Sequence, residues 1–289
     1  MTAHTAQAAS PTRHSSPLAG VRLSFVGTLR SEWIKFFAVR STGWMLVVTL
    51  VTMVGFSAMM AAGMRMAAGA GAGTDASVQM TGDPAMAGLD VGIMSVTFSY
   101  GVAQIVIAVL GALAMTGEFS TGRIRSTFAA VPRRGQVLLA KMIVVALTAF
   151  VTSVVAVAAC FGVVTAILAP VDLAPSLSAD GALRSLVGVP LYLTAITLFA
   201  LAIGTLLRST PGSIAAVLGI ILVLPIVSMI PFDWVQTAAQ FLPAAAGERL
   251  FTGDLMDATL GPWQGFGVLC AWVVVLMAAG AMTLRRRDA

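Results

Sequence analysis

The sequence is poor in charged residues, cysteine and histidine, and each shortage excludes a class of protein. Only 10% of the 289 residues are charged and 58% are hydrophobic, with a mean hydropathy of +0.94. Soluble domains carry about 25% charged residues, and disordered chains are rich in charge, so both classes are excluded. The cysteines, Cys160 and Cys270, lie in apolar runs, and the histidines, His4 and His14, lie in a polar stretch. We therefore expect no disulfide framework, and no metal or cofactor in this chain.

Long uncharged stretches locate the predicted membrane spans. A charge at the centre of a bilayer helix costs roughly 2.5–3.5 kcal/mol, and a crossing helix needs about 20 apolar residues. Six stretches meet both conditions, and we expect spans at about 42–63, 93–117, 142–168, 185–207, 211–231 and 262–284. The expected fold is an all-α integral membrane protein with six transmembrane helices. A single transmembrane domain covers residues 20–289 and follows a disordered tail at 1–19.

The basic residues divide unevenly between the two sides of this arrangement. If the N-terminus is cytoplasmic, only Arg65, Arg184 and Arg249 of the 17 Lys and Arg residues fall outside, which leaves 14 inside. The positive-inside rule then predicts that both termini are cytoplasmic and that the chain is a multi-pass protein of the cell (plasma) membrane. Because the cations line a membrane face, we expect contact with lipid and no binding of nucleic acid.

Two segments outside the spans have a pattern of their own. Residues 20–40 repeat apolar side chains at steps of three and four, with charged residues between them, which predicts an amphipathic helix in the membrane interface. This lead-in helix is either a lipid anchor or an elbow that contacts a partner. The outer segment 231–262 either forms short helices that dip into the membrane over a cavity or is a plain loop.

The inner loop 117–141 concentrates basic charge in a short segment interrupted by Pro132. Such an element needs lipid headgroups or a protein to bind. Gly117 and Gly122 have the spacing of a phosphate-binding P-loop, but Arg123 and Ile124 stand where that motif needs Lys and Ser or Thr. We therefore expect no nucleotide site and no enzymatic activity in this chain.

Mildly polar side chains occur inside the expected spans, where acids, bases and histidine are absent. That absence argues against an intramembrane protease and against an ion-coupled carrier. The polar residues either bond neighbouring helices or line a path for an amphiphilic substrate. The candidates for this lining are Thr97, Tyr100, Gln104, Thr194, Thr197 and Ser228.

The inner loop, GEFSTGRIRSTFAAVPRRGQVLLAK, resembles the loop between the second and third spans of ABC-2-type exporter permeases, especially those of high-GC Gram-positive bacteria. The matching positions are Glu118, Ser120–Gly122, Ile124–Arg125, Pro132–Arg134 and Lys141. Weaker likenesses to the same family lie at Leu29–Arg40 and Leu207–Thr210.

This resemblance implies a half-transporter that pairs with a second permease copy or a homologue. It also implies two copies of a separate ATPase subunit, which bind ATP and Mg²⁺ and dock on the inner loop and the lead-in helix. The implied coupling residues are Glu118, Arg123, Arg125, Arg133, Arg134, Arg30, Glu32 and Lys35. Two other readings are a non-transporting anchor or sensor, and a stand-alone secondary carrier.

Overall fold

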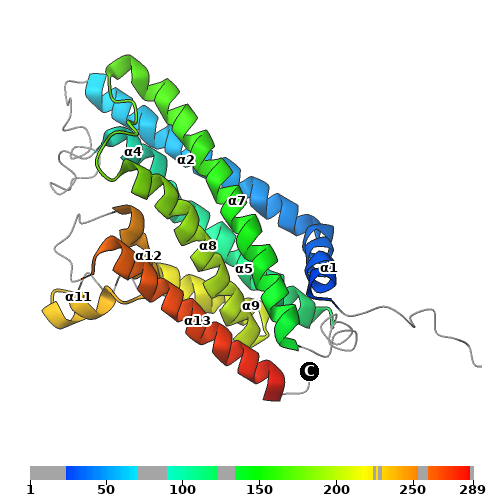
Figure 1. Cartoon of the computed structure of the whole chain (residues 1–289). Helices are drawn as coiled ribbons and strands as arrows, with labels where there is room; N and C mark the ends of the chain where they lie inside the picture. The colour runs from blue at the N-terminus through cyan, green and yellow to red at the C-terminus, as the bar shows by residue number, and fades with distance from the viewer. Residues whose placement is uncertain are drawn as a thin grey trace, which may run out of the picture.

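The computed structural model describes residues 24–69, 90–122, 134–223, 226, 230–252 and 260–286. Every regular element within these residues is helical, which agrees with the expected all-α class. The elements drawn in Figure 1 are α1 (Phe25–Ala38), α2 (Arg40–Ala67), α4 (Val91–Thr97), α5 (Tyr100–Ser120), α7 (Arg134–Leu168), η4 (Ala169–Val171), α8 (Ala182–Leu207), α9 (Thr210–Leu218), η5 (Gly219–Val223), α11 (Asp233–Ala239), α12 (Pro243–Thr252) and α13 (Pro262–Arg286).

Five helical stretches are long and apolar enough to cross a membrane, and they coincide with five of the six expected spans. They are Arg40–Ala67, Val91–Ser120, Gly135–Val171, Ala182–Leu207 and Pro262–Leu284. Several valines on their outer faces, including Val51, Val151 and Val274, are more than half exposed. Apolar side chains turned outward along whole helices suit contact with lipid rather than with water. The chain is therefore a multi-pass membrane protein.

The span expected at 211–231 is described only in part. Its described portion is α9 with η5, which together form a 14-residue apolar helix, Thr210–Val223. That length is short of the roughly 20 residues that a crossing needs. The rest of this prediction falls mostly outside the described residues, so the sixth span stays a prediction.

Helix α7 is longer than the sequence pattern predicts. The expected span starts at residue 142, but one continuous helix runs from Arg134 to Leu168. No residue in Arg134–Lys141 other than Gly135 disfavours a helix, and Val137 and Leu138 are buried. The end of the inner loop is thus a rigid extension of a span.

Helix α8 lies at the centre of the bundle, where it packs against α5, α7, α12 and α13. The α5–α8 contact is very close at Gly111. A Cβ atom added there would lie 2.2 Å from the carbonyl oxygen of Thr197. Glycine is therefore what allows the two backbones to approach, as at other interfaces between membrane helices.

We expect Gly111→Ala to push α5 away from α8 and to lower stability by about 1–3 kcal/mol, the usual cost of overpacking. The matched control is Gly55→Ala in α2, where an added Cβ meets nothing within 4 Å. Thermal unfolding of the two variants in detergent measures the difference. Equal unfolding midpoints for the two variants would show that the close α5–α8 contact does not determine the thermal stability of the protein.

Helix α12 packs into the bundle instead of forming a plain loop, so the short-helix reading of the outer segment agrees with the structure. Glycines on α12 itself and on its two neighbours, α8 and α13, allow this close packing. Cβ atoms added at Gly247 and Gly265 would lie 2.5 Å from Leu269 Cδ2 and 2.3 Å from the Ala246 oxygen, and one added at Gly188 would also be crowded. In Figure 1, α12 lies beside α8 and α13, at the end of the bundle opposite α1.

Candidate functional site

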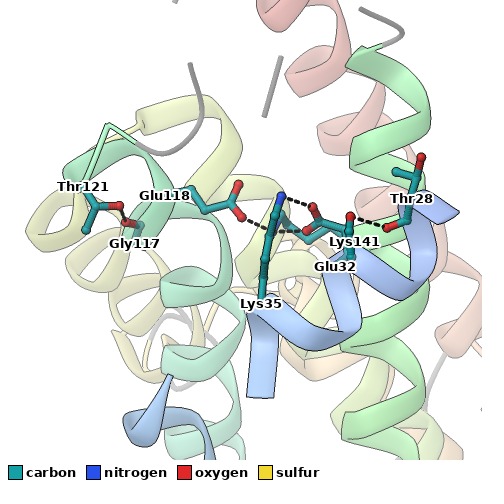
Figure 2. A network of polar contacts seen from close by, with 8 residues as sticks. Thr28, Glu32, Lys35, Gly117, Glu118, Thr121 and Lys141 are labelled. Carbon is teal, nitrogen blue, oxygen red and sulfur yellow. Dashed lines mark hydrogen bonds and ion pairs between the residues drawn. The ribbon is translucent and has the colours of Figure 1, made fainter. Parts of the chain in front are cut away.

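A charge cluster, defined here as Glu32, Lys35, Glu118 and Lys141, joins three helices at the α1 end of the bundle. The Lys141 ammonium group on α7 lies 2.6 Å from Glu32 Oε2 of α1 and donates a hydrogen bond to Glu118 Oε1 of α5 at 2.9 Å. Lys35 donates to Glu32 Oε1 at 2.7 Å within α1. Figure 2 shows Glu32 and Glu118 approaching from two helices with the lysine side chains between them.

The charge cluster is nearly sealed from solvent. The side chains of Glu32, Lys141 and Glu118 are 1%, 8% and 10% exposed. Burial alone would raise the pKa of Glu32, but Lys141 and Lys35 together hold that pKa below its ordinary value. Buried charges are stable only when paired, and Lys141 is the cation that both carboxylates share.

Glu118 is placed where a helix by itself disfavours a carboxylate. It lies in the last turn of α5, which ends at Ser120, and the C-terminal end of a helix carries partial negative charge. Its second oxygen, Oε2, is buried without a hydrogen-bond partner in the described residues. Glu118 therefore does not stabilise α5 by itself, and its contribution comes from the ion pair with Lys141.

The lead-in helix α1 is amphipathic, but the face it turns to the bundle is polar at its centre. Thr28, Glu32 and Phe36 are buried, while Trp33 and Phe37 remain 42% and 45% exposed. Trp33 and Phe37 thus face outward, as expected for a helix in the membrane interface. Ser24 begins the helix by accepting a hydrogen bond from the backbone of Gly27 at 3.0 Å.

The turn between α8 and α9 also lies at the α1 end. Arg208 ends α8 in the left-handed conformation, with φ of 53°, and Ser209 begins α9 by accepting a hydrogen bond from Gly212 N. The Arg208 guanidinium group donates to Thr283 O of α13 and lies 5.3 Å from the centre of the Phe119 ring. This side chain therefore ties α8 and α13 to the end of α5.

A second buried group, the tyrosine cluster, lies between α5, α8 and α12. It consists of Tyr100, Gln104, Tyr192 and Glu248. The Tyr192 hydroxyl lies 2.5 Å from Gln104 Oε1 and 3.2 Å from Glu248 Oε1, and Tyr100 also hydrogen-bonds to Glu248. The rings of Tyr100 and Tyr192 meet edge to face, with centroids 5.9 Å apart.

Beside the tyrosine cluster is a cavity of about 530 Å³. Its wall is mostly apolar and aromatic, with Phe56, Phe98 and Phe251 among the lining residues, and Arg184 and Asp180 also line it. Apolar cavities of about 300–1,000 Å³ with a few polar groups are typical binding sites for small molecules. Tyr100 belongs to both the cavity wall and the tyrosine cluster.

Models of known protein families give no match to this chain. A search of the curated protein sequences also finds no significant match. No family is assigned. What is shown is a helical protein with five candidate membrane spans in its described residues.

The candidate lining residues separate into three groups. Thr97 and Tyr100 line the cavity, and Gln104 lies in the tyrosine cluster. The hydroxyl groups of Thr194 and Thr197 donate to carbonyl oxygens of their own helix, those of Pro190 and Leu193, and neither residue lines the cavity. Ser228 lies outside the described residues.

The candidate coupling residues also separate. The structure joins Glu118, Glu32 and Lys35 through Lys141, whereas Arg30 is exposed on α1. Arg123, Arg125 and Arg133 lie outside the described residues, as does the side chain of Arg134.

Two contacts of these clusters could not be predicted from the sequence pattern. Lys141 matches a position of the ABC-2 permease loop that the inner loop resembles, but nothing near it in sequence points to Glu32, 109 residues earlier. Glu248 lies in the outer segment 231–262, yet it bonds to Tyr192, the eleventh residue of α8. Ten helical steps of 1.5 Å put Tyr192 roughly 15 Å from the start of that helix. The one signal for this is the run of small residues before Glu248, Ala244–Gly247.

Proposed function

We propose that this chain is the membrane subunit of an ATP-driven exporter of the ABC-2 type. It works as a dimer in the plasma membrane, with both termini in the cytoplasm. ATPase subunits dock on the inner loop 117–141. The observation that carries the proposal is the bridge from Lys141 to Glu32 and Glu118. Because the inner loop lacks the lysine of a P-loop, ATP hydrolysis belongs to the partner.

The bridge is suited to transmit movement of the ATPase subunits to the helix bundle. Glu118 and Lys141 lie at the two ends of the inner loop 117–141, in α5 and α7, while Glu32 belongs to the lead-in helix. A displacement of the loop by a docked ATPase subunit therefore moves the ends of α5 and α7 together with α1. Without the bridge, the three helix ends would be free to move separately.

The cavity beside Tyr100 supplies a site for cargo in this proposal. It lies toward the α12 end, opposite the charge cluster, and its aromatic wall suits the apolar part of an amphiphile. Movements at the α1 end reach it through α5, which carries Glu118 at one end and Tyr100 at the other.

The test starts from the protein isolated from its own membranes in mild detergent. We expect an ATP-binding protein to co-purify, and we expect the complex to hydrolyse ATP faster than the isolated ATPase subunit. Charge reversal by Arg133→Glu with Arg134→Glu is expected to abolish this stimulation because it removes the basic docking surface, while the subunit stays folded.

The matched control is Arg65→Glu, a charge reversal at an exposed position in the last turn of α2. It is expected to leave the stimulation unchanged. Full stimulation in the Arg133→Glu, Arg134→Glu complex would refute the docking assignment. The absence of any ATP-binding partner would favour an anchor or a carrier instead.

One observation favours a second candidate, a stand-alone carrier coupled to protons. Such carriers use buried acids within the membrane, and Glu248 is a carboxyl group inside the helix bundle. Purified protein in liposomes would then accumulate an amphiphilic cargo when a pH gradient is imposed without ATP. The exporter proposal expects no such accumulation.

A further inference from the structure

As long as the Gln104 amide turns its oxygen to Tyr192, as it does in this structure, the tyrosine cluster has too few hydrogens for both contacts of Tyr192 when Glu248 is ionised. The Tyr192 hydroxyl carries one proton and faces two acceptors, Gln104 Oε1 at 2.5 Å and Glu248 Oε1 at 3.2 Å. One proton serves one of them. The shorter contact takes it, which leaves the Tyr192 and Glu248 oxygens facing each other without a hydrogen.

We propose that Glu248 is a proton-binding site, that it holds its proton in this structure, and that the proton sets the direction of the hydrogen-bond chain from α12 through α8 to α5. With the proton in place, Glu248 donates to Tyr192, and Tyr192 donates to Gln104. Without it, Tyr192 turns its hydrogen to the Glu248 carboxylate, and the Gln104 amide rotates so that its NH₂ group donates to Tyr192. Both arrangements satisfy every oxygen that the chain contains.

The surroundings of Glu248 favour the neutral acid. Burial raises its pKa to about 7, and the hydrogen bonds from Tyr100 and Tyr192 lower it only in part. Among the described residues, no ion pair of Glu248 with a lysine or arginine is recorded. The neighbouring Arg249 donates to Leu260 O, and Arg184 lies two helical turns from Tyr192 on α8, at the cavity.

The remaining elements packed on α12 add little charge. Helix α13 offers Cys270 as a titratable group among its described side chains, and α9 with η5 offers none. The carboxyl group is thus governed by two phenols and one amide. Gain or loss of the Glu248 proton is therefore the main change of charge that can occur in the tyrosine cluster.

The proton has a short route to this site. Tyr100 lines the cavity and hydrogen-bonds to Glu248, so its side chain connects the buried carboxyl group to the cavity. The protonation of Glu248 therefore follows the pH of the solution to which the cavity opens. This inference does not rest on the exporter proposal, since it concerns binding of a proton by the chain alone.

The test is infrared spectroscopy of the purified chain in lipid nanodiscs, titrated from acid to alkaline pH. We expect a carbonyl-stretch band of a protonated carboxyl group that disappears with a midpoint near pH 7, well above the ordinary value of 4.5. The band is expected to be missing in Glu248→Gln. It is expected to persist in the matched control Glu118→Gln, which removes a buried carboxyl group that is paired with Lys141.

A second variant distinguishes proton binding from a structural role. Tyr192→Phe removes a donor to the ionised carboxylate, so the midpoint is expected to move to higher pH by on the order of one unit. This variant also carries the test if Glu248→Gln fails to fold. The proposal is overturned if no band titrates near pH 7, if the band survives in Glu248→Gln, or if Tyr192→Phe leaves the midpoint unchanged.

Discussion

Lys141→Met is expected to cause one of the two largest losses of stability predicted for this chain. The substitution leaves Glu32 and Glu118, with side chains only 1% and 10% exposed, without the cation that bridges them. Breaking a buried ion pair by removal of one partner typically costs about 3–5 kcal/mol. The free energy of unfolding in detergent, followed by thermal or chemical denaturation, measures this loss.

Lys35→Met is the matched control for this prediction. Lys35 also pairs with Glu32, at 2.7 Å, but it belongs to the same helix and is 26% exposed. Pairs within one helix contribute about 0.2–0.5 kcal/mol, so the control is expected to lose far less stability. Equal losses from the two lysine variants would contradict a bridging role for Lys141.

A triple variant separates charge from packing. Glu32→Gln, Glu118→Gln and Lys141→Met together remove all charge from the bridge, and neutral replacements of a buried ion pair are often tolerated. We expect the triple variant to regain much of the stability that Lys141→Met loses. A triple variant as unstable as the single one would show that the shape of Lys141, and not its charge, holds the helices.

The candidate spans were predictable because lipid imposes a simple rule. A helix that crosses the apolar layer needs about 20 uncharged residues, and this length can be read directly from the sequence. The start of α7 was not predictable from the same rule, because Arg134–Lys141 carries two charged residues and is still helical. Its buried residues, Val137 and Leu138, reveal this only once their packing is known.

The two clusters were predictable only in part. The step of four from Tyr100 to Gln104 indicates a shared helix face, and both side chains do lie in the tyrosine cluster. The step of three from Thr97 to Tyr100 crosses a break between α4 and α5, although both residues line the cavity. The pairing of Glu32 with Lys141 depends on how α1 packs on α7, which no local pattern encodes.

Glu248 shows most clearly what sequence alone does not reveal. An acid in a loop between spans is ordinarily solvated, and its burial here follows from contacts that are distant in sequence. Gly188 on α8 and Gly265 on α13 let α12 approach closely. Ser185 then donates to Phe251 O at 2.7 Å and fixes the end of α12 to α8. The carboxyl group reaches Tyr192 because of this packing.

The second large effect is expected in the pH dependence of stability. The folded pKa of Glu248 is about 7 and its ordinary value is 4.5, so the folded state holds more protons than the unfolded state between these values. Stability from this group is complete below pH 4.5 and is lost as the pH rises through 7. The difference of 2.5 units (7 − 4.5) corresponds to a loss of about 3 kcal/mol.

Thermal unfolding of the wild type in detergent is therefore expected at lower temperature at pH 8 than at pH 5. Glu248→Gln, which cannot ionise, is expected to flatten this dependence. Glu32 acts in another window, because its lowered folded pKa makes its contribution present above pH 4.5 and lost in stronger acid. A wild type whose stability rises from pH 5 to 8, or a Glu248→Gln variant that keeps the full wild-type slope, would contradict the assignment. A flattened slope would locate the proton-sensitive step at the contact of α12 with α8.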